Sequence, residues 1–163
     1  MPHTQAIGGF SLLELICVIV ILGILAAVAG PKLLDTSAFD VRGYTDELAG
    51  AVRDAETVAR ASGCEVQLSI RPRVGYRAQL PAPGACASPG VFTVPVLKAD
   101  GTPLQGTPPS GADVKTRVIL YLRANGALMG VSGPTSITVT GGSAGITPLI
   151  LQIDPYSGLV TVT

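Results

Sequence analysis

The sequence has no tryptophan, a single histidine and few charged residues, which make up 13% of the chain. Its 11 Lys and Arg balance 11 Asp and Glu, which argues against a nucleic-acid binder that relies on bulk positive charge. A hydrophobic fraction of 47% is the opposite of a disordered composition. With 4% aromatic residues, any core must be built from Val, Ile, Leu and Ala. The 163 residues predict one domain, and 20 Gly with 13 Pro indicate many turns and short strands.

The apolar residues gather near the N-terminus. Residues 10–30 contain one charged residue, Glu14. As a helix this segment would reach about 31 Å, enough for a bilayer core of roughly 30 Å. The apolar stretch of a secretory signal peptide is shorter, about 7–15 residues. We therefore predict a membrane-spanning helix over 10–30, in which the costly carboxylate of Glu14 is a candidate functional group.

The string GGFSLLEL at residues 8–15 resembles the processing site of type IV prepilins. The resemblance implies cleavage between Gly9 and Phe10 by a membrane prepilin peptidase, which removes a leader of residues 1–9, and N-methylation of Phe10. It also implies that Glu14 pairs with the Phe10 amine of a neighbouring subunit in a filament. The proline of this family's first helix matches Pro31, where we expect the helix to bend or locally break.

A second helix is expected over about residues 37–62. Apolar residues recur there at steps of three and four, a spacing typical of an amphipathic helix that packs on a sheet. The predicted stripe consists of Val41, Tyr44, Leu48, Val52, Ala55 and Val58 or Ala59. Gly63 is the expected stop.

After Gly63 the hydrophobic period changes to two, which predicts strands. The expected strands are residues 65–70, 75–80, 91–96, 117–122, 137–140, 149–154 and 159–163. Pro95 suggests an edge strand, and the apolar run 117–122 suggests a central one. Residues 154–158 should form a turn between the last two strands, and residues 98–112 an exposed loop. The predicted fold class is α+β: a long N-terminal helix, transmembrane and then amphipathic, packed on an antiparallel sheet, with a globular domain over 31–163.

This order of elements is similar to that of pilins, and two segments narrow the resemblance. Residues 48–70 and 120–126 resemble the GspH/FimT group of minor pilins and pseudopilins. Cys64 and the closing segment 153–160 are closer to minor pilins of the MSHA type. The resemblance implies a minor subunit of an MSHA-like type IV pilus. The alternatives are a pseudopilin of the type II secretion system and a FimT-like competence pilin that binds DNA.

The same resemblance implies where the protein acts and with what. The expected location is the bacterial inner membrane, with one span and a periplasmic globular domain, and then a pilus or pseudopilus. The implied partners are other pilin or pseudopilin subunits, the prepilin peptidase, the inner-membrane assembly platform and inner-membrane lipid. Because the sequence shows no nucleophile motif or phosphate loop, we predict no catalytic activity and no cofactor.

The three cysteines divide by compartment. Cys17 lies in the apolar helix and is predicted to be a packing residue. Cys64 and Cys86 lie in the exported part, where oxidation is possible, and we predict a disulfide between them. Two free thiols, or a bond to another subunit, are the alternatives. No metal site is expected, since only two thiols are exported and the one His lies in the leader.

Arg71, Arg73 and Arg77 surround a predicted hairpin turn. Such a group is most simply a solvated turn. The alternative is a DNA contact, but Tyr76 is the only aromatic residue among them to stack on a base. We therefore do not expect a nucleic-acid partner.

Overall fold

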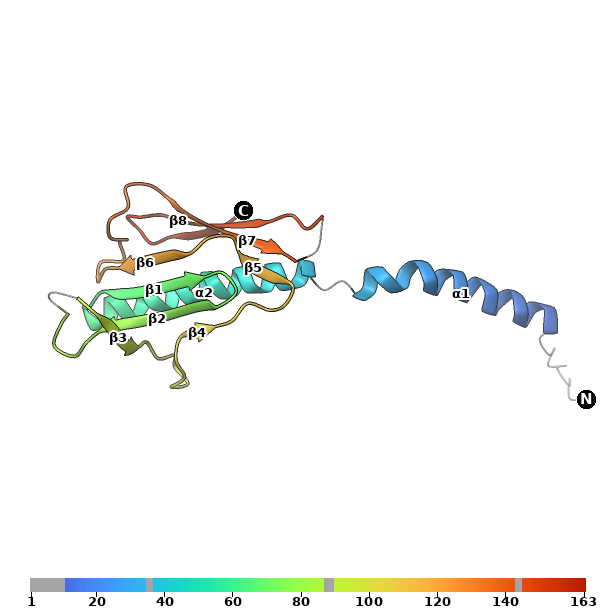
Figure 1. The fold of residues 1–163 in the computed structure, drawn as a ribbon, viewed down its shortest axis with the longest axis horizontal. Coiled ribbons are helices and arrows are strands. Elements are labelled where there is room, and N and C mark those ends of the chain that lie inside the picture. The colour runs from blue at the N-terminus through green and yellow to red at the C-terminus, as the bar shows by residue number, and fades with distance from the viewer. Residues whose placement is uncertain (1–10, 35–36, 87–89, 143–144) are drawn as a thin grey trace, which may run out of the picture. The chain divides into compact units, whose positions relative to one another are not determined.

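The computed structural model describes residues 11–34, 37–86, 90–142 and 145–163, with side chains described for residues 11–26 of the first range. The chain divides into two units, Met1–Thr36 and Ser37–Thr163 (Figure 1). The predicted leader and Phe10 lie outside the described residues. The predicted ranges 1–9, 10–30 and 31–163 stay a prediction.

The first unit contains one helix, α1, which spans Leu12–Leu34. It continues through Gly30 and Pro31, so the local break that we expected there is absent. Inside a helix, proline clashes with the carbonyl four residues earlier and also with the Cβ and amide of the preceding residue. Gly30 has no Cβ, which removes part of the second clash and eases continuation of the helix. A bend at Pro31 stays a prediction.

The second unit is built on α2, which spans Ser37–Ser62, the range expected from the sequence. The helix ends at Gly63, which caps it. Gly63 has a φ of 68°, and its amide donates a hydrogen bond to the Ala59 carbonyl. Its predicted stripe is buried, apart from Val58, which is only partly buried. Thr45, Ala49 and Ala51 widen the buried face. These small residues let strands approach the helix from both sides of the stripe.

The first sheet consists of β1 (Val66–Arg71), β2 (Gly75–Pro81), β3 (Phe92–Pro95), β4 (Gln105–Gly106) and β6 (Val118–Leu122). Its order is β3-β2-β1-β6, with β4 also on β2, and all pairs are antiparallel. The inward residues of β1, Val66, Leu68 and Ile70, are fully buried as predicted. The strand that contains Pro95 lies at an edge, which confirms that expectation.

The prediction that 117–122 forms a central strand is wrong, because β6 ends the strand order of its sheet. Its apolar run has another cause. Leu120 and Leu122 are buried in the core, whereas Tyr121 is half-buried on the other face, with its ring centroid 5.6 Å from that of Phe92. Both faces are thus apolar although one edge lacks a strand.

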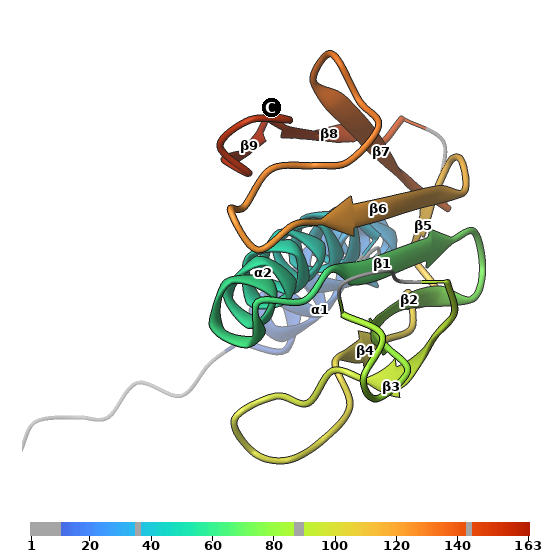
Figure 2. The same ribbon diagram turned by 90° about the vertical axis from the view of Figure 1, so that its left-hand side faces the viewer.

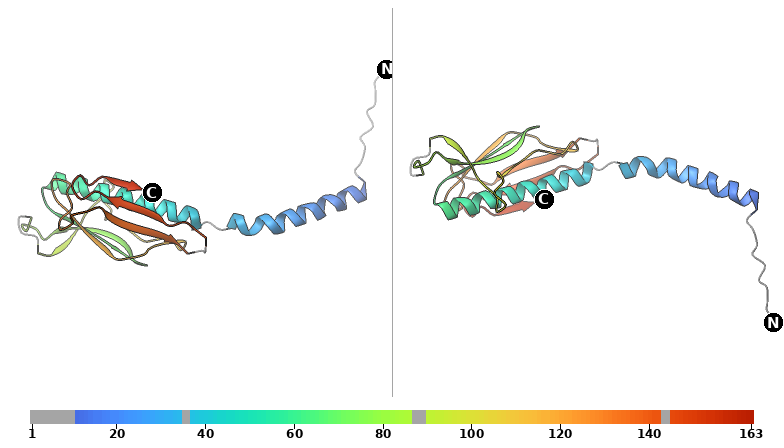
Figure 3. Two further views of the ribbon diagram at one scale, coloured as in Figure 1. Left: turned by 90° about the horizontal axis from the view of Figure 1, so that it is seen from above. Right: turned by 90° about the horizontal axis from the view of Figure 1, so that it is seen from below.

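The second sheet consists of β5 (Ala112–Val114), β7 (Thr135–Gly141), β8 (Leu149–Ile153) and β9 (Val160–Val162), in the order β5-β7-β8-β9. These pairs are also antiparallel. The expected turn at 154–158 joins β8 to β9 as a hairpin. Figure 2 and Figure 3 show α2 along one side of both sheets, and α2 contacts strands of each.

Residues 98–112 are not simply an exposed loop, which corrects the prediction. Leu104 is 2% exposed, its amide donates to the Val96 carbonyl, and its carbonyl accepts from the Ala78 amide. The segment thus returns to β2 and forms β4, and β5 begins at its end. Leu104 is the one large apolar residue in a segment rich in Gly, Pro and Thr, so the segment has no period from which these short strands could be predicted.

Candidate functional site

The surface of α1 is apolar on every side. Its eleven large aliphatic residues between Leu12 and Leu25 are each at least 45% exposed. A helix that is hydrophobic all round is normally buried, in a protein core or in a membrane, because water does not stabilise such a surface. Its side chains therefore need an apolar environment that this unit does not supply within the described residues.

Among the helices whose residues the structure describes, none combines the length and the hydropathy that a bilayer crossing needs. The predicted span, 10–30, includes Phe10 and four residues whose side chains are not described. The span as a whole stays a prediction.

Glu14 lies in the first turn of α1 and is the one charged residue among residues 11–26. A carboxylate at this end of a helix interacts favourably with the helix dipole. Within the described residues, no cation forms an ion pair with it. Gly9 and Phe10 lie outside those residues, so cleavage, methylation and the pairing of Glu14 with a neighbouring Phe10 stay predictions.

The predicted bond between Cys64 and Cys86 is present, and the two Cα atoms are 4.8 Å apart. Cys64 follows the glycine cap of α2 and is 9% exposed. The disulfide thus ties the end of α2 and the start of β1 to the loop after β2. Cys17 is a free, exposed thiol on α1, and its predicted packing role remains untested.

The three arginines of the β1–β2 hairpin do not act as one group. Arg71 ends β1 and Arg77 lies in β2, and both line a hollow of about 420 Å³ on the outer face of the first sheet. Arg73 lies in the turn between the strands, with a φ of 61°, and its amide donates to Asp113 Oδ1 at 2.8 Å. Ser69, Gln79, Gln105 and Thr107 also line this arginine hollow, together with Tyr76.

Sequence reasoning missed the part of the hollow contributed by Gln105 and Thr107, because β4 has no periodic signal. Beneath it, the Tyr76 hydroxyl donates to Glu47 Oε1 at 2.8 Å. Burial, this hydrogen bond and the nearby charge of Glu47 raise the pKa of Tyr76. Burial, followed by the charges of Glu47 and Asp113, raises the pKa of Tyr44 to about 12. Both phenols are therefore neutral at physiological pH.

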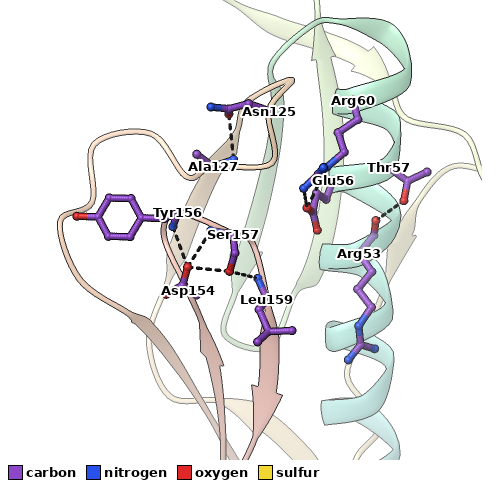
Figure 4. Close-up of polar contacts among 10 residues, drawn as sticks. All are labelled: Arg53, Glu56, Thr57, Arg60, Asn125, Ala127, Asp154, Tyr156, Ser157 and Leu159. Carbon is purple, nitrogen blue, oxygen red and sulfur yellow. Dashed lines mark hydrogen bonds and ion pairs between the residues drawn. The ribbon is translucent and has the colours of Figure 1, made fainter.

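Two turns lie close to the polar face of α2, and the polar contacts drawn in Figure 4 run within the helix and within each turn. Arg60 Nη2 lies 2.5 Å from Glu56 Oε1. A Cβ at Gly126 or Gly158 would meet this pair, so both glycines allow their turns to approach α2 closely. In the second turn, Asp154 Oδ1 accepts hydrogen bonds from the Ser157 amide and hydroxyl and from the Tyr156 amide, which lower the pKa of Asp154. These contacts explain how the turns are held.

Across the part of the chain that the structure describes, no three His, Cys, Asp or Glu side chains are grouped so that they could hold a metal ion. The candidate features are therefore the exposed apolar helix with Glu14, the disulfide and the arginine hollow.

Comparisons with known proteins found one match to the N-terminal segment and one similar solved structure. Residues 5–30 match the family described as "Prokaryotic N-terminal methylation motif". No curated protein matches the chain. The crystal structure of the type IV minor pilin FimU of Pseudomonas aeruginosa is similar, with a TM-score of 0.55 and 14% identity, over 78% of this chain and 91% of that chain. At this identity the likeness shows the fold alone. The N-terminal motif and the α+β fold together are those of a type IV pilin-like protein, of the kind that includes minor pilins and pseudopilins.

Proposed function

We propose that the protein is a minor subunit of an MSHA-like type IV pilus. In this proposal the prepilin peptidase cuts between Gly9 and Phe10, and Phe10 is then N-methylated. Before assembly the apolar helix anchors the subunit in the inner membrane, with the globular domain in the periplasm. The role is structural assembly rather than catalysis, with the inner-membrane assembly platform and other pilins as partners.

The single observation that carries assembly through the N-terminal helix, which a pilus subunit and a pseudopilin would share, is the uncovered apolar surface of α1. Fully burying one large aliphatic side chain is worth about 1.5–3 kcal/mol, so eleven of them give a strong drive to associate with lipid or with like helices. A filament core of such helices satisfies the requirement without a partner of different chemistry. The matched methylation motif, which covers the same helix, supports this assignment.

In this proposal Glu14 fixes how far neighbouring N-terminal helices are shifted along one another in the filament. Inside a bundle of apolar helices its carboxylate would be isolated from water, which is costly for a charge without a partner. The free amine of a neighbouring processed Phe10 has the opposite charge. Removing one partner of a buried ion pair typically costs about 3–5 kcal/mol.

The test is the Glu14→Ala variant in a host that makes the filament. We expect normal insertion, cleavage and methylation by mass spectrometry, but at least about a hundredfold less protein in sheared filaments, because the ion pair is lost. Ser11→Ala, which alters a neighbouring exposed residue, is the control and should assemble normally. Normal incorporation of Glu14→Ala would refute the pairing role.

The alternative is a pseudopilin of the type II secretion system, which would need the same helix. Deletion of the gene separates the two functions. Loss of pili with normal protein secretion supports the proposal, whereas loss of secretion with normal pili favours the alternative.

The second alternative is a FimT-like pilin that binds DNA. Its support is that Arg71 and Arg77 lie on one exposed face of the sheet. Two such side chains provide about two phosphate contacts, which gives weak, salt-sensitive binding.

A further inference from the structure

The side chains of the arginine hollow are brought together by the register of three strands. Because Leu68 and Ile70 of β1 point into the core, Ser69 and Arg71 face outward. Ser69 pairs with Arg77 of β2, and Arg77 pairs with Gln105 of β4. These partners share the outer face with Ser69. Residues 36 positions apart in the sequence thus form one row.

The charged side chains that line the hollow are both arginines, and the Glu47 carboxylate lies beneath the lining, where it accepts a hydrogen bond from the Tyr76 hydroxyl. Arg71 and Arg77 are diagonal neighbours on the two strands, and both are exposed. No Asp or Glu lines the hollow, and within the described residues the ion pairs involve Arg60 and Arg123 instead. Like charges placed this closely repel, so an anion between them would relieve the repulsion. An oxyanion suits the space between the two arginines because two guanidinium groups can each donate paired hydrogen bonds to it.

The remaining lining offers neutral hydrogen-bonding groups. Gln79 and Gln105 each carry an amide that both donates and accepts, and Thr107 carries a hydroxyl. The shape depends on Gly75, because a Cβ there would lie within 2 Å of the Gly106 carbonyl oxygen and push β4 away. At about 420 Å³ the hollow has the size of a small-molecule site.

We propose that the arginine hollow binds a small hydroxylated acid, such as one acidic sugar unit, with its carboxylate or phosphate between Arg71 and Arg77. The hydroxyl groups of this ligand bond to Gln79, Gln105 and Thr107. A nucleic acid fits less well, because base stacking needs an accessible aromatic face and the ring of Tyr76 belongs to a residue that is 4% exposed. This inference does not depend on the proposed role in a pilus.

The experiment uses the full chain in a non-ionic detergent, with binding measured by ligand-detected NMR. The probes are glucuronate, glucose 6-phosphate, glucose and inorganic phosphate. We expect one of the two acidic sugars to bind about tenfold more tightly than glucose and inorganic phosphate, because it alone satisfies both the arginines and the neutral groups. Which of the two binds identifies the acid as a carboxylate or a phosphate.

Arg71→Gln and Arg77→Gln should each weaken that binding about tenfold or more, since each removes a charged hydrogen-bond donor. Arg53→Gln is the matched control, because Arg53 is exposed on α2 and does not line the hollow, and it should bind as the wild type does. Circular dichroism checks that all variants are folded. Equal binding of inorganic phosphate and the sugars, equal binding of glucose and the acids, binding insensitive to both substitutions, or no binding would each overturn the proposal.

Discussion

Removal of the disulfide should destabilise the globular unit by an amount that follows from its loop length. Cys64 and Cys86 are 22 residues apart in the sequence. In the chain-entropy model, a loop of this length constrains the unfolded state by about 3 kcal/mol. For a unit of this size that corresponds to a decrease in melting temperature of about 10 °C. The variant to measure is Cys64→Ala with Cys86→Ala.

The measurement is thermal and urea unfolding of a soluble form that begins at Lys32. We expect this form to fold, because every buried hydrophobic residue of the described chain belongs to the second unit. The reduced wild-type protein provides the essential comparison. If loop constraint is the cause, the reduced protein and the double variant should lose stability equally. Replacing Cys17 cannot affect this form, because Cys17 precedes Lys32; in the full chain, Cys17→Ser should leave stability unchanged.

Two outcomes would refute this reasoning. A double variant within about 1 kcal/mol of the oxidised wild type would mean that the bond constrains little. A double variant much less stable than the reduced wild type would mean that the buried thiol of Cys64 contributes mainly through packing. Non-reducing peptide mapping of periplasmically expressed protein must first find the bond, and two free thiols there would contradict the structure itself.

Three further predictions concern processing, the last turn and DNA. Gly9→Val should block cleavage because a β-branched side chain obstructs the scissile position, and an uncut chain by mass spectrometry is the expected result; normal cutting would contradict it. Asp154→Ala should lower the urea midpoint at pH 6, with a difference that shrinks below about pH 4. The folded pKa of Asp154 is depressed by its hydrogen bonds, so its contribution is present above the unfolded pKa and is lost as pH falls; a difference that grows in acid would refute this. The exported part has 11 Lys and Arg against 10 Asp and Glu, so we expect little duplex DNA binding at about 150 mM salt. Micromolar binding in a mobility shift, abolished by replacing Arg71, Arg73 and Arg77 with Ala, would promote the competence function.

Elements with a strong local period could be predicted from the sequence. In α2 the stripe from Val41 to Ala59 has the helical spacing, and a glycine follows the last turn as a cap. In β1 the alternation of Val66, Leu68 and Ile70 predicts which face is buried. In both cases burial on one face is sufficient to determine the local structure, because neighbouring residues share the same packing requirement.

Elements defined by a distant partner could not be predicted in this way. The two residues of β4 are a strand only because β2 lies beside them, and Leu104 is buried only because the chain returns there. The position of β6 at the end of the strand order depends on topology, since an apolar run predicts burial of two faces but not the number of neighbours. The period of the sequence predicts which face of a helix or strand is buried. It does not predict the order of the strands, which depends on where the turns lead the chain.

The same distinction applies to the candidate functional features. Glu14 could be found from the sequence because it is a charged residue within an apolar run. The residues that make it unusual are its neighbours in the sequence, so no fold is needed to see it. The spacing of Arg71, Arg73 and Arg77 also has a period of two, which by itself predicts one shared face. The hairpin interrupts that period. Because Arg71 pairs with Gly75, Arg73 falls midway between them at the tip of the turn, while Arg77 returns to the face of Arg71 opposite Ser69. The turn thus places Arg71 and Arg77 where both could contact one anion. Arg73 lies in the turn instead, and its backbone amide donates a hydrogen bond to Asp113.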